Sequence, residues 1–189
     1  SLSPYTLEEV VSRDYLLKEK PDVIIDLVDA TNIERNLYLA TQLLEIGIPV
    51  VIALNMVDLL KKNNIHINVK GLSSALGCPI VETSALKGTG LKEVVDEAIK
   101  CANQHRVPSK QMEFPKAVEK AVNEIEGLVP VNISEENKRW YAVKLLERDS
   151  KVKEGLNLPA SAQSRIEEIA SGLEKAEDDD TESIVTDGR

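Results

Sequence analysis

Three short apolar runs, separated by segments with helical periodicity, constrain the fold more than any other feature of this sequence. The runs cover residues 23–30, 49–55 and 78–85. Runs of this length and β-branched composition are typical of strands, and strands that alternate with helices indicate βαβ units and a parallel sheet. The stretches 23–28 and 50–54 are interpreted as apolar throughout, which is expected when helices cover both faces of the sheet. The sequence therefore predicts an α/β fold.

Helix signals surround these runs. Asn32 is the expected N-cap of one helix, and Gly47 lies just past its end. A short helix is expected to begin near Val57 and to end soon afterwards. The longer predicted helices cover residues 4–18, 33–46 and 69–76, and another one follows Gly90.

The composition changes near Val107-Pro108, and no convincing strand follows from Phe114 onward. Apolar residues recur there at helical spacing, with Trp140 expected as a core residue. We therefore predict two domains, 1–108 with the α/β fold and 109–189 as an all-α helical subdomain. The acidic stretch 178–182 is expected to be a solvated surface or a frayed end.

Charge and composition exclude several classes of protein. The net charge of -9 argues against a nucleic-acid partner, since such proteins usually carry a basic face. Cys78 and Cys101 form no paired motif, so two reduced thiols in a cytoplasmic protein are expected. His66 and His105 lack clustered partners, so no metal site is predicted. No apolar stretch approaches the ~20 residues that a transmembrane helix needs.

Polar residues follow the second and third predicted strands where a ligand site is expected. Asn55 and Asp58 follow one strand, and Ser84 and Ala85 follow the next. Open parallel sheets bind ligands beyond the carboxyl ends of their strands. A carboxylate there can accept hydrogen bonds from N1–H and N2–H of guanine, and adenine lacks this paired donor edge. Asn55 can bridge the base and neighbouring loops, and the backbone N–H of Ala85 can donate to guanine O6.

These residues carry a resemblance to a known family. Asn55-Met56-Val57-Asp58 matches the N-[KM]-x-D motif of P-loop GTPases, and Ser84-Ala85-Leu86 matches their S-A-[KL] motif. Together with residues 1–16 and 29–58, the chain resembles the cytosolic GTPase domain of bacterial ferrous iron transport protein B. The resemblance is dense over residues 1–105, and in that family a helical regulatory subdomain follows.

The resemblance implies a P-loop GTPase-like, mostly parallel sheet and a GTP- and GDP-binding function with Mg²⁺. It implies that the intact protein hydrolyses GTP and regulates ferrous iron transport at the cytoplasmic face of the bacterial inner membrane. Its expected partners are the attached membrane iron-permeation domain and further copies of itself. It implies nucleotide-binding roles for Asn55, Met56, Asp58, Ser84, Ala85 and Leu86.

The phosphate-binding motifs of that family are missing from the printed sequence. It contains neither the G-x-x-x-x-G-K-[ST] loop nor the D-x-x-G motif, and both are expected upstream of Ser1. Residues 23–28 are expected to form a central strand, whose second neighbour feeds that missing loop. Catalytic residues and Mg²⁺ ligands are therefore not assigned here, and this chain alone is expected to be inactive.

Two alternatives remain open at this point. One is another P-loop GTPase, for instance a factor for ribosome assembly or tRNA modification. The other is a non-catalytic α/β protein-binding fragment, in which Asn55 and Asp58 cap the following helix and Met56 packs in the core.

Overall fold

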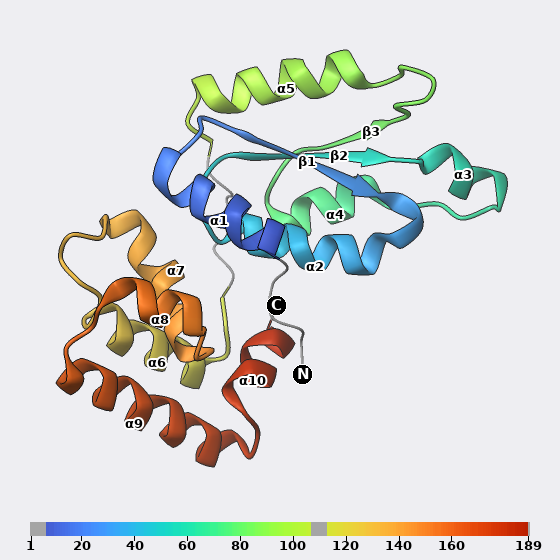
Figure 1. The fold of residues 1–189 in the computed structure, drawn as a ribbon. Coiled ribbons are helices and arrows are strands. Elements are labelled where there is room, and N and C mark those ends of the chain that lie inside the picture. The colour runs from blue at the N-terminus through green and yellow to red at the C-terminus, as the bar shows by residue number, and fades with distance from the viewer. Residues whose placement is uncertain (1–6, 107–112, 189) are drawn as a thin grey trace. The chain divides into compact units, whose positions relative to one another are not determined.

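The computed structural model describes residues 7–106 and 113–188 (Figure 1). The chain divides into two units, Ser1–Gln111 and Met112–Arg189. The boundary predicted between residues 108 and 109 lies outside the described residues, so its position stays a prediction.

The first unit contains three parallel strands in the order β1-β2-β3. They are β1 (Ile24–Asp29), β2 (Val50–Asn55) and β3 (Ile80–Thr83). Their register places Asp29, Asn55 and Thr83 side by side at the carboxyl edge of the sheet. The predicted parallel α/β arrangement is therefore confirmed, although each strand is shorter than its apolar run.

Five helices accompany the described sheet: α1 (Leu7–Glu19), α2 (Ile33–Leu44), α3 (Val57–Lys62), α4 (Val69–Leu76) and α5 (Leu91–Asn103). A 3-10 turn, η1 (Ala30–Asn32), precedes α2. Asn32 occupies the predicted N-cap position of α2, but its side chain makes no capping hydrogen bond. Residues 4–6, where the first helix was predicted to begin, lie outside the described residues.

Helices cover both faces of this sheet, because β2 is apolar on both sides. Val50, Ile52 and Leu54 pack in the core on the side of α2 and α4. Val51 packs on the other side against Ala98 and Cys101 of α5. Figure 1 shows α5 on one side of the strands and α2 and α4 on the other. Cys78 and Cys101 are both buried and free, as two reduced thiols would be.

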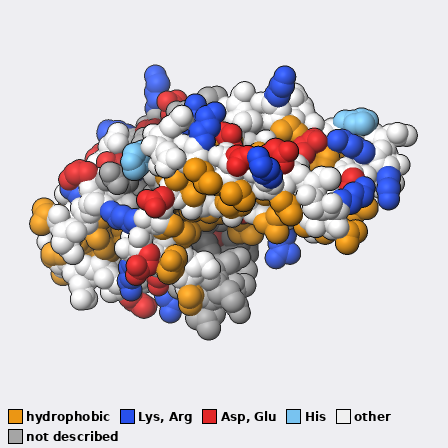
Figure 2. Space-filling view, turned by 90° about the horizontal axis from the view of Figure 1, so that it is seen from above, with side chains coloured by type: hydrophobic (Ala, Val, Ile, Leu, Met, Phe, Trp, Pro, Cys, Tyr) orange, Lys and Arg blue, Asp and Glu red, His pale blue; other side chains and the backbone are white. Residues whose placement is uncertain are grey.

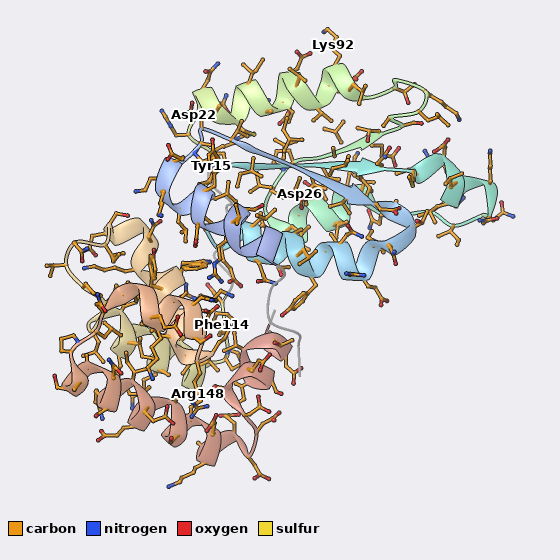
Figure 3. The ribbon with its side chains drawn as sticks, in the orientation of Figure 1. Tyr15, Asp22, Asp26, Lys92, Phe114 and Arg148 are labelled. Carbon is orange, nitrogen blue, oxygen red and sulfur yellow. The ribbon has the colours of Figure 1, made fainter. Side chains whose placement is uncertain are left out.

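The prediction that residues 23–28 are apolar on both faces is wrong. Asp26 lies mid-strand in β1 and shares its face with Ile24 and Val28, which pack on the α2 side (Figure 3). Burial raises the pKa of the Asp26 carboxyl to about 6. On the opposite face, Ile25 and Leu27 are exposed. The hydrophobicity of the run therefore concealed a titratable core residue.

The second unit is helical throughout its described residues, 113–188, as predicted. Its helices are α6 (Lys116–Glu126), α7 (Glu135–Leu146), α8 (Ser150–Leu156), α9 (Ala160–Glu177) and α10 (Thr181–Gly188). Trp140 is buried, which confirms it as a core residue. The expected frayed or merely solvated end is wrong for residues 181–182, because α10 begins at Thr181 and both Thr181 and Val185 are buried.

Arg148, just past the end of α7, connects three helices of this unit (Figure 3). Its guanidinium donates to Glu167 of α9 at 2.8 and 3.1 Å and also binds Glu174 of the same helix. It donates to Thr181 Oγ1 at the start of α10 at 3.1 Å. The Arg148 guanidinium, with help from the Thr181 N–H, lowers the pKa of Glu174 to about 2. This cluster explains why the acidic end of the chain is ordered onto the other helices.

Candidate functional site

The turn from β2 into α3 brings Asn55 and Asp58 to the carboxyl edge of the sheet. Met56, between them, adopts the left-handed conformation with φ 65° and ψ 20°, which is uncommon for a bulky residue. Val57 is buried and anchors the start of α3. The sharp turn at Met56 therefore lets the strand end in an amide while the first turn of α3 carries a carboxylate.

Asn55 connects this turn to the loop after β3. Its Oδ1 accepts a hydrogen bond from the backbone N–H of Ala85 at 3.0 Å. The N-cap of α3 is Met56, which makes no side-chain capping bond. The capping alternative is therefore wrong for Asn55, whose recorded hydrogen bond crosses to another loop.

The loop after β3 is closed on itself between Ser84 and Thr89. The Ser84 N–H donates to the Thr89 carbonyl at 3.0 Å, and the Thr89 N–H donates back at 3.2 Å. Gly90 follows with φ 77°, and a Cβ there would lie 2.2 Å from the Glu82 carbonyl oxygen. Only glycine fits this position, so β3 turns abruptly into α5. The closure presents Ala85 and Leu86 to solvent, with Leu86 97% exposed.

Asp58 also reaches this loop, through a residue that the sequence motifs did not identify. Lys87 Nζ lies 2.9 Å from Asp58 Oδ2, and its hydrogen bond holds the pKa of that carboxyl below its usual range. Both side chains remain partly exposed, at 57% for Lys87 and 31% for Asp58. The only signal for Lys87 in the sequence was its place directly after Ser84-Ala85-Leu86.

The structure thus brings the six predicted residues onto two adjoining loops, residues 55–58 and 84–89. The 55–58 loop offers a carboxylate and an amide, and the 84–89 loop offers a backbone N–H. Met56 is 40% exposed, so part of its side chain is available to a ligand. The predicted donor to guanine O6, the Ala85 N–H, here donates to Asn55 instead.

Two further searches of the described residues gave negative results. No group of three or more His, Cys, Asp or Glu residues in the described ranges could hold a metal ion. None of the described helices combines the length and the hydrophobicity that crossing a membrane requires.

A parallel sheet with helices on both faces, polar loops at its carboxyl edge and a following helical unit define the fold class. The class is that of the α/β G domain with an appended helical domain. The model of the ferrous iron transport protein B family matches residues 1–98, and that of the FeoB cytosolic helical domain matches residues 114–189. The chain therefore belongs to the ferrous iron transport protein B family.

Relatives agree with this assignment. The Fe(2+) transporter FeoB of Escherichia coli is 37% identical over 150 residues, which cover 78% of this chain and 19% of that protein. A Fe(2+) transport protein A/Fe(2+) transporter FeoB fusion protein of Porphyromonas gingivalis is 37% identical over 100% of this chain and 24% of its own length. The chain thus spans about a fifth to a quarter of these curated relatives.

Solved structures match the whole chain. NFeoB from S. thermophilus bound to mGMPPNP has a TM-score of 0.89 and 44% identity, and covers 100% of this chain and 71% of its own. NFeoB from S. thermophilus bound to GDP.AlF4- and K+ has a TM-score of 0.88 and 44% identity, with 100% and 73% coverage. The fold prediction and the family resemblance are both confirmed.

Proposed function

We propose that this chain contributes the base-binding half of a guanine-nucleotide site in a ferrous iron transporter. The observation that carries the proposal is the convergence of the 55–58 and 84–89 loops through the Asn55–Ala85 hydrogen bond. Matched structures of S. thermophilus NFeoB bind GDP or mGMPPNP, and they share 44% of their residues with this chain. That similarity supports a guanine nucleotide as the ligand.

The proposed recognition follows from hydrogen-bond chemistry. Asp58 accepts from N1–H and N2–H of guanine, an edge that adenine does not offer. Charge-assisted hydrogen bonds of this kind are stronger than neutral ones, so Asp58 sets the choice of base. Met56 and Leu86 supply apolar contact to the ring, and Ser84 and Ala85 keep the loop close to it. Asn55 holds the two loops at a fixed separation.

We further propose that the intact protein hydrolyses GTP and uses the nucleotide state to regulate ferrous iron passage through a membrane domain. The proposed location is the cytoplasmic face of the bacterial inner membrane, and further copies of the protein are a proposed partner. Mg²⁺ would neutralise phosphate charge in such a reaction. No Mg²⁺ ligand or catalytic residue is assigned to the described part of the chain, where no metal-binding cluster occurs.

The test is a titration of the intact protein with GDP, GTP, ADP and ATP, followed by isothermal calorimetry. We expect saturable binding of both guanine nucleotides and at least tenfold weaker binding of the adenine nucleotides. Equal affinity for GDP and ADP would contradict the assignment of Asp58. Membership of the iron-transport family disfavours a ribosome-assembly or tRNA-modification GTPase, and the net charge of -9 agrees with that.

A further inference from the structure

Both groups that the proposed function assigns to the guanine edge are bound to other groups of this protein. Oδ2 of Asp58, the proposed acceptor, lies 2.9 Å from Lys87 Nζ. The backbone N–H of Ala85, the proposed donor, is held by Asn55 Oδ1 at 3.0 Å. The hydrogen-bonding capacity that a base would use is therefore already engaged inside the molecule.

Lys87 is well placed to exchange with a ligand. Its backbone N–H donates to the Ser84 carbonyl at 3.2 Å, so the closed 84–89 loop fixes where its side chain begins. The ammonium is accessible to water, since the side chain is 57% exposed. It can therefore leave Asp58 without burying an unpaired charge, which keeps the cost of exchange small.

We propose that Lys87 is an internal competitor for the guanine-recognition carboxylate, so that nucleotide binding exchanges the Lys87 ammonium on Asp58 for the N1–H and N2–H groups of the base. The inference rests on the proposed function and deepens it, because it assigns an affinity-setting role to a residue outside both sequence motifs. Lys87 is a specificity-site residue in this sense, and it takes no part in phosphate chemistry.

The exchange has a kinetic consequence. A base bound to Asp58 needs both carboxylate oxygens in the plane of its edge, and an ammonium that pulls on Oδ2 weakens that pairing. When the base moves outward, Lys87 takes the oxygen before the base returns. Lys87 therefore accelerates release and keeps Asp58 paired in the empty site. Exposed ion pairs of this kind alter equilibria by roughly two- to fivefold.

The experiment compares Lys87→Gln with the wild type in the intact protein, using stopped-flow release of a fluorescent GDP analogue. We expect Lys87→Gln to release GDP roughly two- to fivefold more slowly and to bind it correspondingly more tightly. Lys87→Arg keeps the charge and should behave as the wild type. Lys61→Gln is the matched control, because Lys61 is similarly exposed and pairs with Glu82 at 3.2 Å.

A second measurement separates competition at Asp58 from a general charge effect. In an Asp58→Asn background there is no carboxylate to hold, so Lys87→Gln should leave GDP release unchanged. Equal slowing by Lys87→Gln and Lys61→Gln would overturn the proposal, as would slowing that persists in the Asp58→Asn background. Faster or unaltered release in Lys87→Gln would also overturn it, since a supporting residue speeds release when removed. A wild-type protein that binds no GDP would overturn the proposed function itself.

Discussion

Asn55 Oδ1 accepts a hydrogen bond from the backbone N–H of Ala85, thirty residues further along the chain, at 3.0 Å. The two residues follow neighbouring parallel strands, whose register pairs Asn55 with Thr83. One amide side chain therefore fixes the separation between the loop that carries Asp58 and the loop that carries Leu86. Because the separation is set by a single hydrogen bond, small changes in either loop should alter ligand release before they alter the fold.

The first prediction concerns the choice of base. Asp58→Asn removes the charged acceptor for guanine N1–H and N2–H and supplies an amide donor at the same place. GDP affinity should fall by roughly ten- to a hundredfold, the range expected for a lost charged hydrogen bond. Relative affinity for the xanthine nucleotide should rise, because xanthine has a carbonyl where guanine has its amine. Calorimetric titration with both nucleotides measures the two effects, and an unaltered GDP affinity would rule the assignment out.

The second prediction concerns the 84–89 loop. Ala85→Leu places a bulky side chain beside the N–H that Asn55 holds, so it should crowd the base and raise the rate of GDP release. Ala85→Ser is the matched control, because it keeps the residue small and should release GDP almost as the wild type does. Stopped-flow fluorescence of a labelled GDP gives both rates. Equal rates for Leu and Ser at this position would show that the loop does not contact the base.

Sequence patterns predicted the elements well and their side-chain connections poorly. The strand ends at Asn55 and Thr83 follow from local apolar runs, and family motifs identified the two loops. The ion pair between Asp58 and Lys87 joins residues on different loops, so no local pattern encodes it. Asn32 was expected to cap α2, but the 3-10 turn before it alters the backbone, and the described capping bond comes from Asp29 to Thr31. Asp26 was hidden because one carboxyl hardly changes the hydrophobicity of its run.

The third prediction uses the pH dependence of Asp26. Its pKa is raised from 3.8 to about 6 by burial, so the folded state binds the proton more tightly than the unfolded state. The folded protein therefore loses stability as the pH rises from about 4 to 6, by at most roughly 3 kcal/mol. Asp26→Asn removes this loss and should raise the melting temperature at pH 7 but hardly at pH 4.5.

Thermal unfolding of the intact protein at both pH values tests this prediction. Asp22→Asn is the matched control, since Asp22 is an exposed carboxyl just before the same strand (Figure 3). It should leave the melting temperature unaltered at either pH. An Asp26→Asn variant that is less stable than the wild type at pH 7 would mean that the Asp26 carboxylate is stabilised by its surroundings.

The fourth prediction concerns Arg148 in the helical unit. Arg148→Met removes the hydrogen bonds to Glu167, Glu174 and Thr181 and should release α10 from α9. The side chain is partly exposed, so we expect a loss of roughly 1–2 kcal/mol, below the upper range for charged hydrogen bonds. In the wild type the depressed pKa of Glu174, about 2 against 4.5, gives stability that is complete above pH 4.5 and is lost as the pH falls toward 2.

Trp140 makes this measurement specific, because it is the only tryptophan of the chain and is buried in α7. Its fluorescence during urea unfolding reports on the helical unit. Arg165→Met is the control, since Arg165 also joins two helices through Glu124 and Glu168 but is more exposed, at 53%. It should cost well under half as much. Equal costs for the two variants would show that Arg148 is an ordinary surface ion pair.

The fifth prediction is that residues 1–189 on their own bind GTP negligibly and do not hydrolyse it. Their sequence contains no G-x-x-x-x-G-K-[ST] loop, whose backbone N–H groups and Lys hold most of the charge of the ligand. Recognition of the base through Asp58 cannot replace those contacts. The 55–58 and 84–89 loops should therefore select a nucleotide that another segment binds tightly.

The same fragment should also be poorly soluble, for a reason that the first unit displays on one side. Ile25 and Leu27 of β1 are 48% and 63% exposed, and Leu91, Val95 and Ile99 of α5 are 46–55% exposed at helical spacing. Figure 2 looks onto this side and shows hydrophobic side chains gathered beside charged ones. β1 is also an edge strand of the described sheet, and an edge beside aliphatic side chains is a template for aggregation.

Expression of residues 1–189 alone, followed by size-exclusion chromatography, near-UV circular dichroism and titration with GTP, tests both statements. We expect aggregated or partly unfolded material without measurable GTP affinity. The matched S. thermophilus structures are longer, since this chain covers 71–73% of them. Adding the segment that carries the phosphate loop, covalently or as a second chain, should therefore restore solubility and Mg²⁺-dependent GTP binding together. A folded, monodisperse fragment with ordinary GTP affinity would mean that these residues bind the phosphates through groups other than a phosphate loop.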